Sequence, residues 1–158
     1  MRAAVLTISD GVKQGTRADA SGDLAQEALA GLGFSVVDRV VVADNRSDIV
    51  AALRSLVEAE TELVVTTGGT GFGPRDVTPE ATTEVIDRPA PGLAELMRAA
   101  GLAHTPMAAL SRGVAGAARR SLIINLPGSP KGVRESLDAV LDILPHALRL
   151  LAGDTAHG

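Results

Sequence analysis

The sequence predicts an α/β fold of three layers, in which a mostly parallel, twisted sheet lies between two layers of helices. One observation is a set of short β-branched runs that are apolar at successive positions, which is typical of strands buried on both faces. These runs are Ala3–Ile8, Val36–Val42, Leu63–Thr67 and Leu122–Leu126. The other observation is that segments with helical spacing separate the runs, and parallel strands need crossovers of that kind.

Two helices are predicted between the first three strands. Ser21 is placed as the N-cap of a helix that runs to about Gly31, because a serine hydroxyl accepts a hydrogen bond from a free amide of the first turn. Ser47 is placed as the N-cap of the next helix, whose apolar residues share one face. These residues are Ile49, Leu53, Leu56 and Val57.

The middle of the chain predicts two more helices. Thr78, Pro79 and Glu80 read as the N-cap, the first helical residue and the first-turn acid of one helix. A Pro-Ala-Pro-Gly break at 89–92 precedes the other helix, which is expected over 93–101. The segment that joins the third strand to the first of these helices is therefore a loop.

The rest of the chain is expected to close one domain. The stretch Met107–Gly116 stays open between a short strand and a turn. A final helix follows the loop at 127–132, and Pro145 should kink or divide that helix. No repeat or linker interrupts the sequence, so residues 1–152 are expected to form a single domain and 153–158 a frayed tail.

Composition limits the function classes. The chain has 158 residues, of which 46% are hydrophobic and 22% charged, as is typical of a globular domain. Fifteen Lys and Arg against 19 Asp and Glu give a net charge of −4, without a block of like charges. Because a polyanion would meet mild general repulsion, the sequence argues against nucleic acid as a partner.

Metal and membrane chemistry are limited in the same way. The chain has no cysteine and three histidines, which are scattered at 104, 146 and 157. Disulfides, thiol nucleophiles and Cys or His metal clusters are therefore excluded, and a metal needs oxygen ligands. No apolar stretch approaches the roughly 18 residues of a membrane span, and the N-terminal apolar run is too short for a signal peptide. We expect a cytoplasmic protein that does not enter a membrane.

The chemistry is expected at the carboxyl ends of the strands, where open parallel sheets bind their ligands. Polar residues follow every predicted strand: Ser9 and Asp10, Asp44 and Asn45, Gly68–Asp76, and Pro127–Lys131. Because the strands are parallel, these four loops should meet at one edge of the sheet.

The densest of the four loops contains Gly68, Gly69, Thr70 and Gly71. Glycines let the backbone approach a ligand closely and turn its N–H groups inward, so a phosphate or a nucleotide is the natural ligand. The alternative is a tight turn that only needs positive φ angles. The loop matches neither the Walker pattern nor the dinucleotide fingerprint.

Asp44 and Asp76 are the candidate catalytic residues and metal ligands. Carboxylates without cysteine or histidine neighbours suit Mg²⁺, which binds a few carboxylates together with phosphate oxygens and water. The cations available to offset a triphosphate are Arg75, Arg112 and Lys131. Two alternatives stay open: Asp76 caps a helix or pairs with Arg75, and Asp44 is an acid of a turn.

Three weaker candidates lie at the same edge. Ser9 and Asp10 offer contacts to a second polar ligand, although Ser-Asp-Gly is also ordinary turn chemistry. Ser111 and Arg112 offer an anion contact; the alternative is that Arg112 is only a solvated charge on the surface. The Pro-Gly-Ser segment at 127–129 either closes over a ligand or only starts the last helix.

The run Thr-Thr-Gly-Gly-Thr-Gly-Phe-Gly-Pro-Arg-Asp-Val-Thr-Pro-Glu-Ala-Thr at 66–82 resembles the signature of the molybdopterin adenylyltransferase family, which includes the Mog-like proteins and the G domain of gephyrin. Five further segments are similar to the same family in the same order: 6–11, 19–23, 111–116, 121–132 and 144–151. The resemblance covers nearly the whole chain.

This resemblance implies a homotrimer that uses ATP and Mg²⁺ to transfer AMP to the phosphate of molybdopterin, with release of pyrophosphate. Asp76 matches the family's Mg²⁺-linked catalytic acid, and Asp44 matches the acid that follows the second strand. The family usually has Val-Pro-Asp at that place, whereas this chain has Val-Ala-Asp at 42–44. The residues that match the family's two binding loops are Gly68, Gly69, Thr70 and Gly71, and Pro127, Gly128 and Ser129.

Three functions are therefore in competition. The leading one is a molybdopterin adenylyltransferase, an enzyme of molybdenum cofactor biosynthesis. Its expected protein partner is a molybdenum insertase, which acts on the adenylylated product. The second is a non-catalytic molybdopterin-binding carrier or scaffold of the MoaB-like branch, which tends to depart at the segment that matches Arg75–Pro79, whereas this chain keeps Arg-Asp-Val-Thr-Pro there. The third is a nucleotide-binding enzyme that acts on another phosphorylated metabolite.

Overall fold

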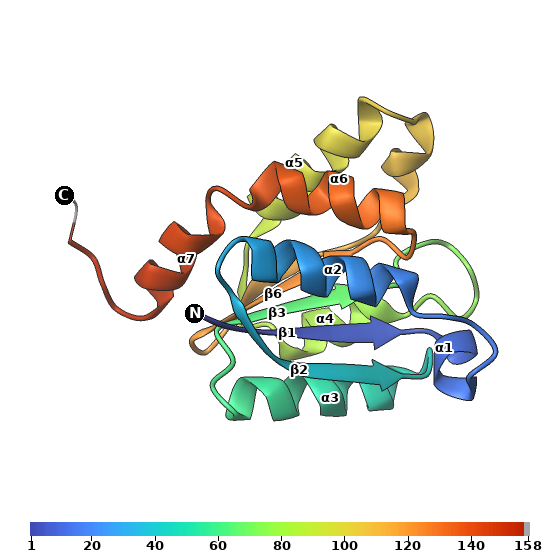
Figure 1. The fold of residues 1–158 in the computed structure, drawn as a ribbon, viewed down its shortest axis with the longest axis horizontal. Helices are drawn as coiled ribbons and strands as arrows, with labels where there is room; N and C mark the ends of the chain where they lie inside the picture. Colours follow the sequence, from blue (N-terminus) through green and yellow to red (C-terminus); the bar gives the residue numbers. More distant parts are fainter. Residues whose placement is uncertain (157–158) are drawn as a thin grey trace.

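The computed structural model describes residues 1–156 and contains a six-stranded sheet with the order β2-β1-β3-β6-β5-β4 (Figure 1). The strands are β1 (Arg2–Ile8), β2 (Ser35–Val42), β3 (Leu63–Thr67), β4 (Arg88–Pro89), β5 (Ala115–Ala118) and β6 (Ser121–Leu126). Strands β2, β1, β3 and β6 are parallel, whereas β5 and β4 extend the sheet in antiparallel pairing. The predicted, mostly parallel sheet is confirmed.

Helices cover both faces of this sheet. They are α1 (Asp10–Gln14), α2 (Ala20–Gly31), α3 (Arg46–Glu58), α4 (Thr78–Val85), α5 (Pro91–Leu102), α6 (Pro130–Val140) and α7 (Leu144–Leu151), with a 3-10 helix η1 (Pro106–Leu110). Figure 1 shows α2 and α6 over one face of the sheet and α3 across the other. The three-layer prediction is therefore confirmed.

Alternating residues of the central strands build two separate cores. Val5 of β1 packs with Leu29 of α2 and Leu137 of α6, whereas Leu6 packs with Leu53 of α3. All of these side chains are fully buried. Burial of such a side chain contributes about 1.5–3 kcal/mol, and it closes both faces of the sheet to ligands. Only the ends of the strands and the loops remain for a site.

One strand does not fit the predicted pattern of burial on both faces. Every residue of β3 and β6 is buried, but no residue of β2 is: its first half is mostly exposed, with Val37 at 41%, and its second half is half-buried. The reason is its place in the sheet, since β2 is an edge strand with β1 as its neighbour. The sequence run predicts the strand correctly but not its position in the sheet.

Two predicted helix caps are wrong by two residues. The carboxylate of Asp19, not Ser21, caps α2, and the amide side chain of Asn45, not Ser47, caps α3. The Ser21 hydroxyl instead donates to the carbonyl of Gly128, at 2.6 Å. This bond joins the start of α2 to the loop after β6, so Ser21 has a tertiary role that its local sequence does not indicate.

Thr78 is the first residue of α4 and not its N-cap. Val77 occupies the cap position without a side-chain hydrogen bond. The Thr78 hydroxyl donates to the carbonyl of Gly68 at 2.9 Å, and its N–H donates to the carbonyl of Gly69 at 3.1 Å. The side chain therefore holds the glycine loop and does not serve the helix.

The stretch at 107–116, open from the sequence, contains most of η1 and the beginning of β5. The helix expected over 93–101 is α5, which begins two residues earlier at Pro91. The sequence did not indicate β4 or the short helix α1, because a two-residue strand and a five-residue helix carry no periodic pattern.

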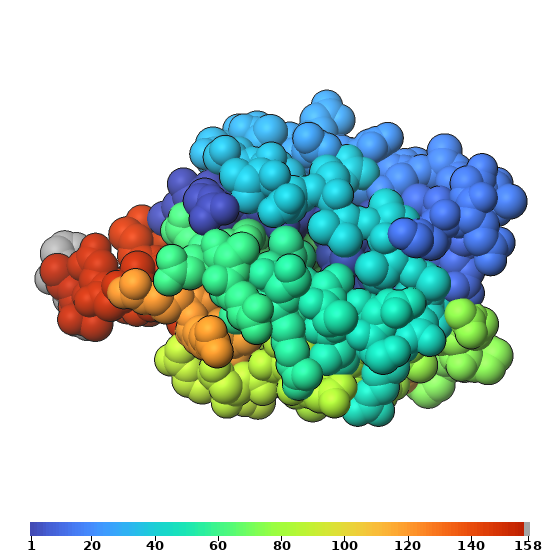
Figure 2. All heavy atoms as spheres, turned by 90° about the horizontal axis from the view of Figure 1, so that it is seen from below, coloured from blue at the N-terminus to red at the C-terminus, as the bar shows by residue number. Residues whose placement is uncertain are grey.

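Pro145 divides the last helical segment, as expected. Helix α6 ends at Val140, and α7 begins at Leu144 with Pro145 in its first turn. Residues 154–156 of the predicted tail belong to no helix or strand, and residues 157 and 158 lie outside the described part. Figure 2 shows the C-terminal segment projecting from the body of the molecule. In residues 1–156, no helix has both the length and the apolar character that a membrane crossing requires.

Candidate active site

The carboxyl ends of the four parallel strands surround a polar cavity of about 320 Å³. Its lining includes Ser9 after β1, Asp44 after β2, Gly68, Gly69 and Asp76 after β3, and Gly128 and Ser129 after β6. Residues 17–21, which enter α2, form another wall. The four loops thus meet at one edge of the sheet, as the parallel topology predicts.

The glycine loop after β3 depends on backbone conformations that favour glycine. Gly68 has a φ of +94° and Gly69 a φ of +69°. A Cβ atom on Gly68 would collide with the carbonyl oxygen of Ile8, and one on Gly69 would collide with the hydroxyl of Thr78. The tight-turn interpretation of these two glycines is therefore correct, and the same turn places the loop along the wall of the polar cavity.

Asp44 and Asp76 face the same cavity from different loops. Oδ2 of Asp44 accepts a hydrogen bond from the N–H of Asp10 at 2.9 Å, and Oδ1 of Asp10 accepts one from the N–H of Asp44 at 3.0 Å. Oδ2 of Asp76 accepts a hydrogen bond from the N–H of Gly73 at 2.8 Å. The backbone thus orients one oxygen of each acid.

Asp10, which follows β1, and Asp44, which follows β2, differ in their electrostatic surroundings. Burial raises the pKa of Asp44; the N–H of Asp10 opposes this effect, and the negative charges of Asp10 and Asp76 add to it. The hydrogen bond from Arg75 lowers the pKa of Asp10, and the backbone bond from Asp44 lowers it further. A cation in the cavity would therefore favour the charged form of Asp44.

The donor chemistry of Asp44 and Asp76 fits Mg²⁺. Two carboxylates supply hard oxygen ligands, and the cavity leaves room for the water and phosphate oxygens that complete the shell of this ion. Within residues 1–156, no group of three or more His, Cys, Asp or Glu side chains is arranged to hold a metal. A metal at this place therefore needs ligand oxygens besides those of the protein.

Asp44→Asn is expected to raise the melting temperature of the protein at neutral pH. A raised pKa means that the folded protein holds the Asp44 proton more tightly than the unfolded chain does, so stability is lost as the pH rises through that pKa. The side-chain amide of the Asn variant cannot ionise, so the variant avoids this loss. Because solvent partly screens the charge of Asp44 in the wild type, the melting temperature should rise by only about 1–3 °C.

Thermal unfolding of both proteins between pH 4 and pH 7, without divalent cations, checks this expectation. The difference in melting temperature should grow with pH, and a difference that is the same at every pH would contradict it.

Arg75 and Asp10 form an ion pair with each other, and neither residue lines the polar cavity. Arg75 Nε lies 2.6 Å from Oδ2 of Asp10, and Nη2 lies 3.0 Å from Oδ1. The sequence places Arg75 beside a phosphate or Asp76, but its partner in the structure is 65 residues away in the chain. The pair joins the loop after β1 to the loop after β3 at the rim of the cavity.

Arg112 also differs from the anion contact expected of it. Its Nε donates to the carbonyl of Gly71 at 2.7 Å, Nη2 to the carbonyl of Asp76 at 2.8 Å, and Nη1 to the carboxylate of Glu80 at 2.7 Å. The guanidinium also lies 5.6 Å from the ring centre of Phe72. Arg112 therefore braces both ends of the segment that carries Asp76.

Arg112→Lys is expected to lower the free energy of unfolding by about 2 kcal/mol, because hydrogen bonds of charged groups contribute about that much and lysine cannot reproduce the planar set of donors. Urea unfolding measures this loss. Arg54→Lys, at an exposed position on α3, serves as the control and should have no effect. Equal stability of the two variants would show that Arg112 does not brace the loop.

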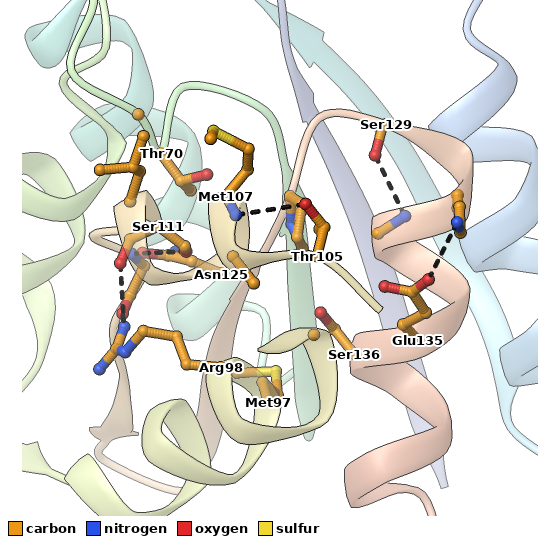
Figure 3. A pocket seen from close by; sticks show the side chains of 18 of the residues that line it. Thr70, Met97, Arg98, Thr105, Met107, Ser111, Asn125, Ser129, Glu135 and Ser136 are labelled. Atoms are coloured by element: carbon orange, nitrogen blue, oxygen red, sulfur yellow. Dashed lines mark hydrogen bonds and ion pairs between the residues drawn. The ribbon is translucent and has the colours of Figure 1, made fainter. Parts of the chain in front are cut away.

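A second cavity, of about 330 Å³, adjoins the first on the other side of the glycine loop. It lies between α5, η1 and α6, and Figure 3 shows its side chains converging from these elements. The predicted residues that line it are Thr70, Gly71, Ser111, Pro127, Ser129 and Lys131. Ser129 lines both cavities and also caps α6 through its hydroxyl.

Sequence reasoning missed the remaining walls of this second cavity. They include Met97, Arg98, Met107, Leu110, Asn125 and Glu135. No local sequence signal indicates Met107 and Leu110, whose exposure of 65% and 52% appears only in the structure. The rest are ordinary helix or strand residues whose common orientation depends on how α5 packs against α6.

Fold and site together define an α/β protein in which a glycine loop and two carboxylates form a pocket suited to a phosphorylated ligand and a divalent cation. The chain belongs to the family described as "Probable molybdopterin binding domain", whose model matches residues 4–146. The resemblance drawn from residues 66–82 is thereby confirmed.

Two relatives and one solved structure indicate how close the similarity is. The chain is 44% identical over 153 residues to a molybdopterin adenylyltransferase of Helicobacter pylori strain J99, which covers 95% of this chain and 87% of that protein. It is 37% identical over 169 residues to the molybdopterin adenylyltransferase of Escherichia coli K12, with 97% and 86% covered. The structure of the molybdopterin biosynthesis enzyme MoaB from Thermus thermophilus is 55% identical, with a TM-score of 0.91 and 96% of each chain covered.

Proposed function

We propose that this chain is a molybdopterin adenylyltransferase, an enzyme of molybdenum cofactor biosynthesis that transfers AMP from ATP to the phosphate of molybdopterin. The observation that carries the proposal is that Asp44 and Asp76 line one polar cavity beside the glycine loop. Relatives that bear this name, at 44% and 37% identity along nearly the whole chain, support it.

The two cavities suit the two parts of such substrates. The polar cavity contains the carboxylates and fits phosphate groups with their cation. The second cavity has mostly apolar walls and fits a flat ring system. Because Ser129 and the Gly68–Gly71 loop border both, a ring in one cavity and phosphates in the other meet above this loop.

The reaction needs alignment and charge neutralisation more than a protein nucleophile. An oxygen of the molybdopterin phosphate attacks the α-phosphorus of ATP in line, a new P–O bond forms, and the bond to the departing pyrophosphate breaks. The backbone N–H groups of Gly69–Gly71 orient the α-phosphate, and Asp44 and Asp76 would hold Mg²⁺. When bound, this ion supplies charge neutralisation to the phosphates.

The deciding experiment mixes the protein with molybdopterin, ATP and MgCl₂ and measures pyrophosphate release together with the mass of the pterin product. We expect adenylylated molybdopterin and an equal amount of pyrophosphate, both abolished by EDTA. A carrier of the MoaB-like kind would bind the pterin and release no pyrophosphate. An enzyme for another phosphorylated metabolite would neither bind molybdopterin nor lose ATP binding in its presence.

The homotrimer and the insertase partner belong to the same proposal, since they derive from the family resemblance. Light scattering of the purified protein tests the trimer. Transfer of the adenylylated product to an added insertase tests the partner.

A further inference from the structure

The second cavity contains a carboxylate for which the proposed reaction has no use. Glu135 of α6 lines this cavity, and Figure 3 shows its carboxylate beside the helix with the ion pair to Lys131 as a dashed line. The walls around this space are largely apolar, formed by residues such as Ala94, Met97 and Leu110. A carboxylate in such a wall loses hydration and needs partners that replace it.

Two other polar side chains of this cavity, those of Arg98 and Asn125, already have partners within the protein. Arg98 donates to the carbonyls of Ser111 and Gly113, at 3.3 and 2.8 Å. The side-chain amide of Asn125 donates to two threonine hydroxyls at 3.0 Å and accepts from the N–H of Val114 at 3.1 Å. These groups hold the walls in place, so they are not free to recognise a ligand.

Glu135 is different. Its side chain is 14% exposed, and its buried Oε1 has no hydrogen-bond partner among the described residues. Oε1 lies 3.8 Å from Nδ1 of His104 and 3.9 Å from Nζ of Lys131, and both distances exceed hydrogen-bond length. Lys131 itself is 77% exposed, although it also lines this cavity. The carboxylate thus lies in the cavity wall with one long ion pair to Lys131 but without a hydrogen bond from the described residues.

The chemistry of the missing partner follows from that of the carboxylate. An ionised carboxyl group accepts hydrogen bonds and donates none, so its partner must carry N–H or O–H donors. A buried acceptor without a partner is unfavourable, which makes a donor supplied by the ligand favourable at this place. In a flat heteroaromatic ring that enters an apolar cavity, the exocyclic amino group is such a donor.

We propose that Glu135 is a specificity-determining residue, which binds the exocyclic amino group of the planar ring held in the second cavity. The inference rests on the proposed function for the two candidate rings, the adenine of ATP and the pterin of molybdopterin. Both carry an amino group beside ring nitrogens, so the chemistry of recognition is the same for either.

Two pairs of probes separate the sources. ATP and purine riboside 5′-triphosphate differ in the amino group of the purine, and pterin and lumazine differ in the amino group of the pteridine. Dissociation constants of the four compounds for the wild-type protein, measured by calorimetry or pterin fluorescence, should show a preference of about 10-fold or more for the amino compound of one pair. That pair identifies the ring which occupies the cavity.

Two variants then test the residue. Glu135→Met removes the acceptor at similar length and should reduce the preference to about twofold or less, whereas Glu135→Gln keeps one neutral acceptor and should give an intermediate value. Glu95→Met, at an exposed position of α5 outside the cavity, should keep the full preference. Melting temperatures establish that all three variants are folded.

Several results would overturn the assignment. They are equal affinity within both pairs, no binding of any of the four probes, or an undiminished preference in Glu135→Met. The measurements need no turnover, so their outcome is separate from that of the proposed function. A protein that prefers the amino compound through Glu135 but releases no pyrophosphate would support this assignment and contradict the adenylyltransferase.

Discussion

Asp76→Asn is expected to lower the rate of AMP transfer by about 100- to 1,000-fold, the usual cost of removing one group that stabilises developing charge in a transition state. The amide is neutral and binds Mg²⁺ poorly, so the phosphates lose part of their neutralisation. The amide oxygen can still accept the hydrogen bond that Oδ2 of Asp76 receives from Gly73, so the loop should keep its shape. Molybdopterin-dependent pyrophosphate release measures the effect.

The Mg²⁺ dependence of the residual activity of Asp76→Asn is a second, independent measurement. If Asp76 holds the ion, the variant should need a higher MgCl₂ concentration to reach half of its maximal rate. Asp142→Asn, an exposed acid between α6 and α7, is the matched control and should behave as the wild type does. A normal rate with an unchanged Mg²⁺ requirement in Asp76→Asn would remove Asp76 from the mechanism.

Gly68→Ala is expected to destabilise the protein by about 2–4 kcal/mol, because backbone strain and overpacking each contribute about 1–3 kcal/mol. The φ of +94° at this residue is unfavourable for alanine, and the added methyl group would meet the carbonyl oxygen of Ile8. That atom belongs to the backbone of the central strand β1 and cannot easily move. The loop should shift away from β1, so ATP binding should weaken with stability.

Gly31→Ala is the control for this substitution. Gly31 ends α2, has an ordinary φ, and has no atom within 4 Å of the position that a Cβ would take. Alanine there should leave stability unchanged or raise it by up to about 1 kcal/mol, because alanine has the higher helix propensity. Urea unfolding of both variants measures the contrast. Equal stabilities would mean that the turn at Gly68 tolerates a side chain.

The sequence predicts most of the fold because its signals are local. Apolar runs without alternation indicate the buried strands β1, β3 and β6, and glycine-rich or Asp-containing loops after each strand indicate where the chemistry lies. The same local signals fail at the helix caps, where Asp19 and Asn45 compete with serines two residues away. Either residue type caps helices well, and backbone geometry alone decides between them.

By itself, the sequence determined the α/β class, the edge of the sheet that carries the site, and the candidate acids Asp44 and Asp76. Only the tertiary structure decided the partners of the charged groups, since Arg75 pairs with Asp10 across 65 residues and Arg112, for which the sequence offered an anion contact or a solvated surface charge, braces the loop that carries Asp76. It also created the second cavity and the position of Glu135 within it. The physical reason is that strand and helix formation follows short-range periodicity, whereas ion pairs and cavities arise where distant segments pack together.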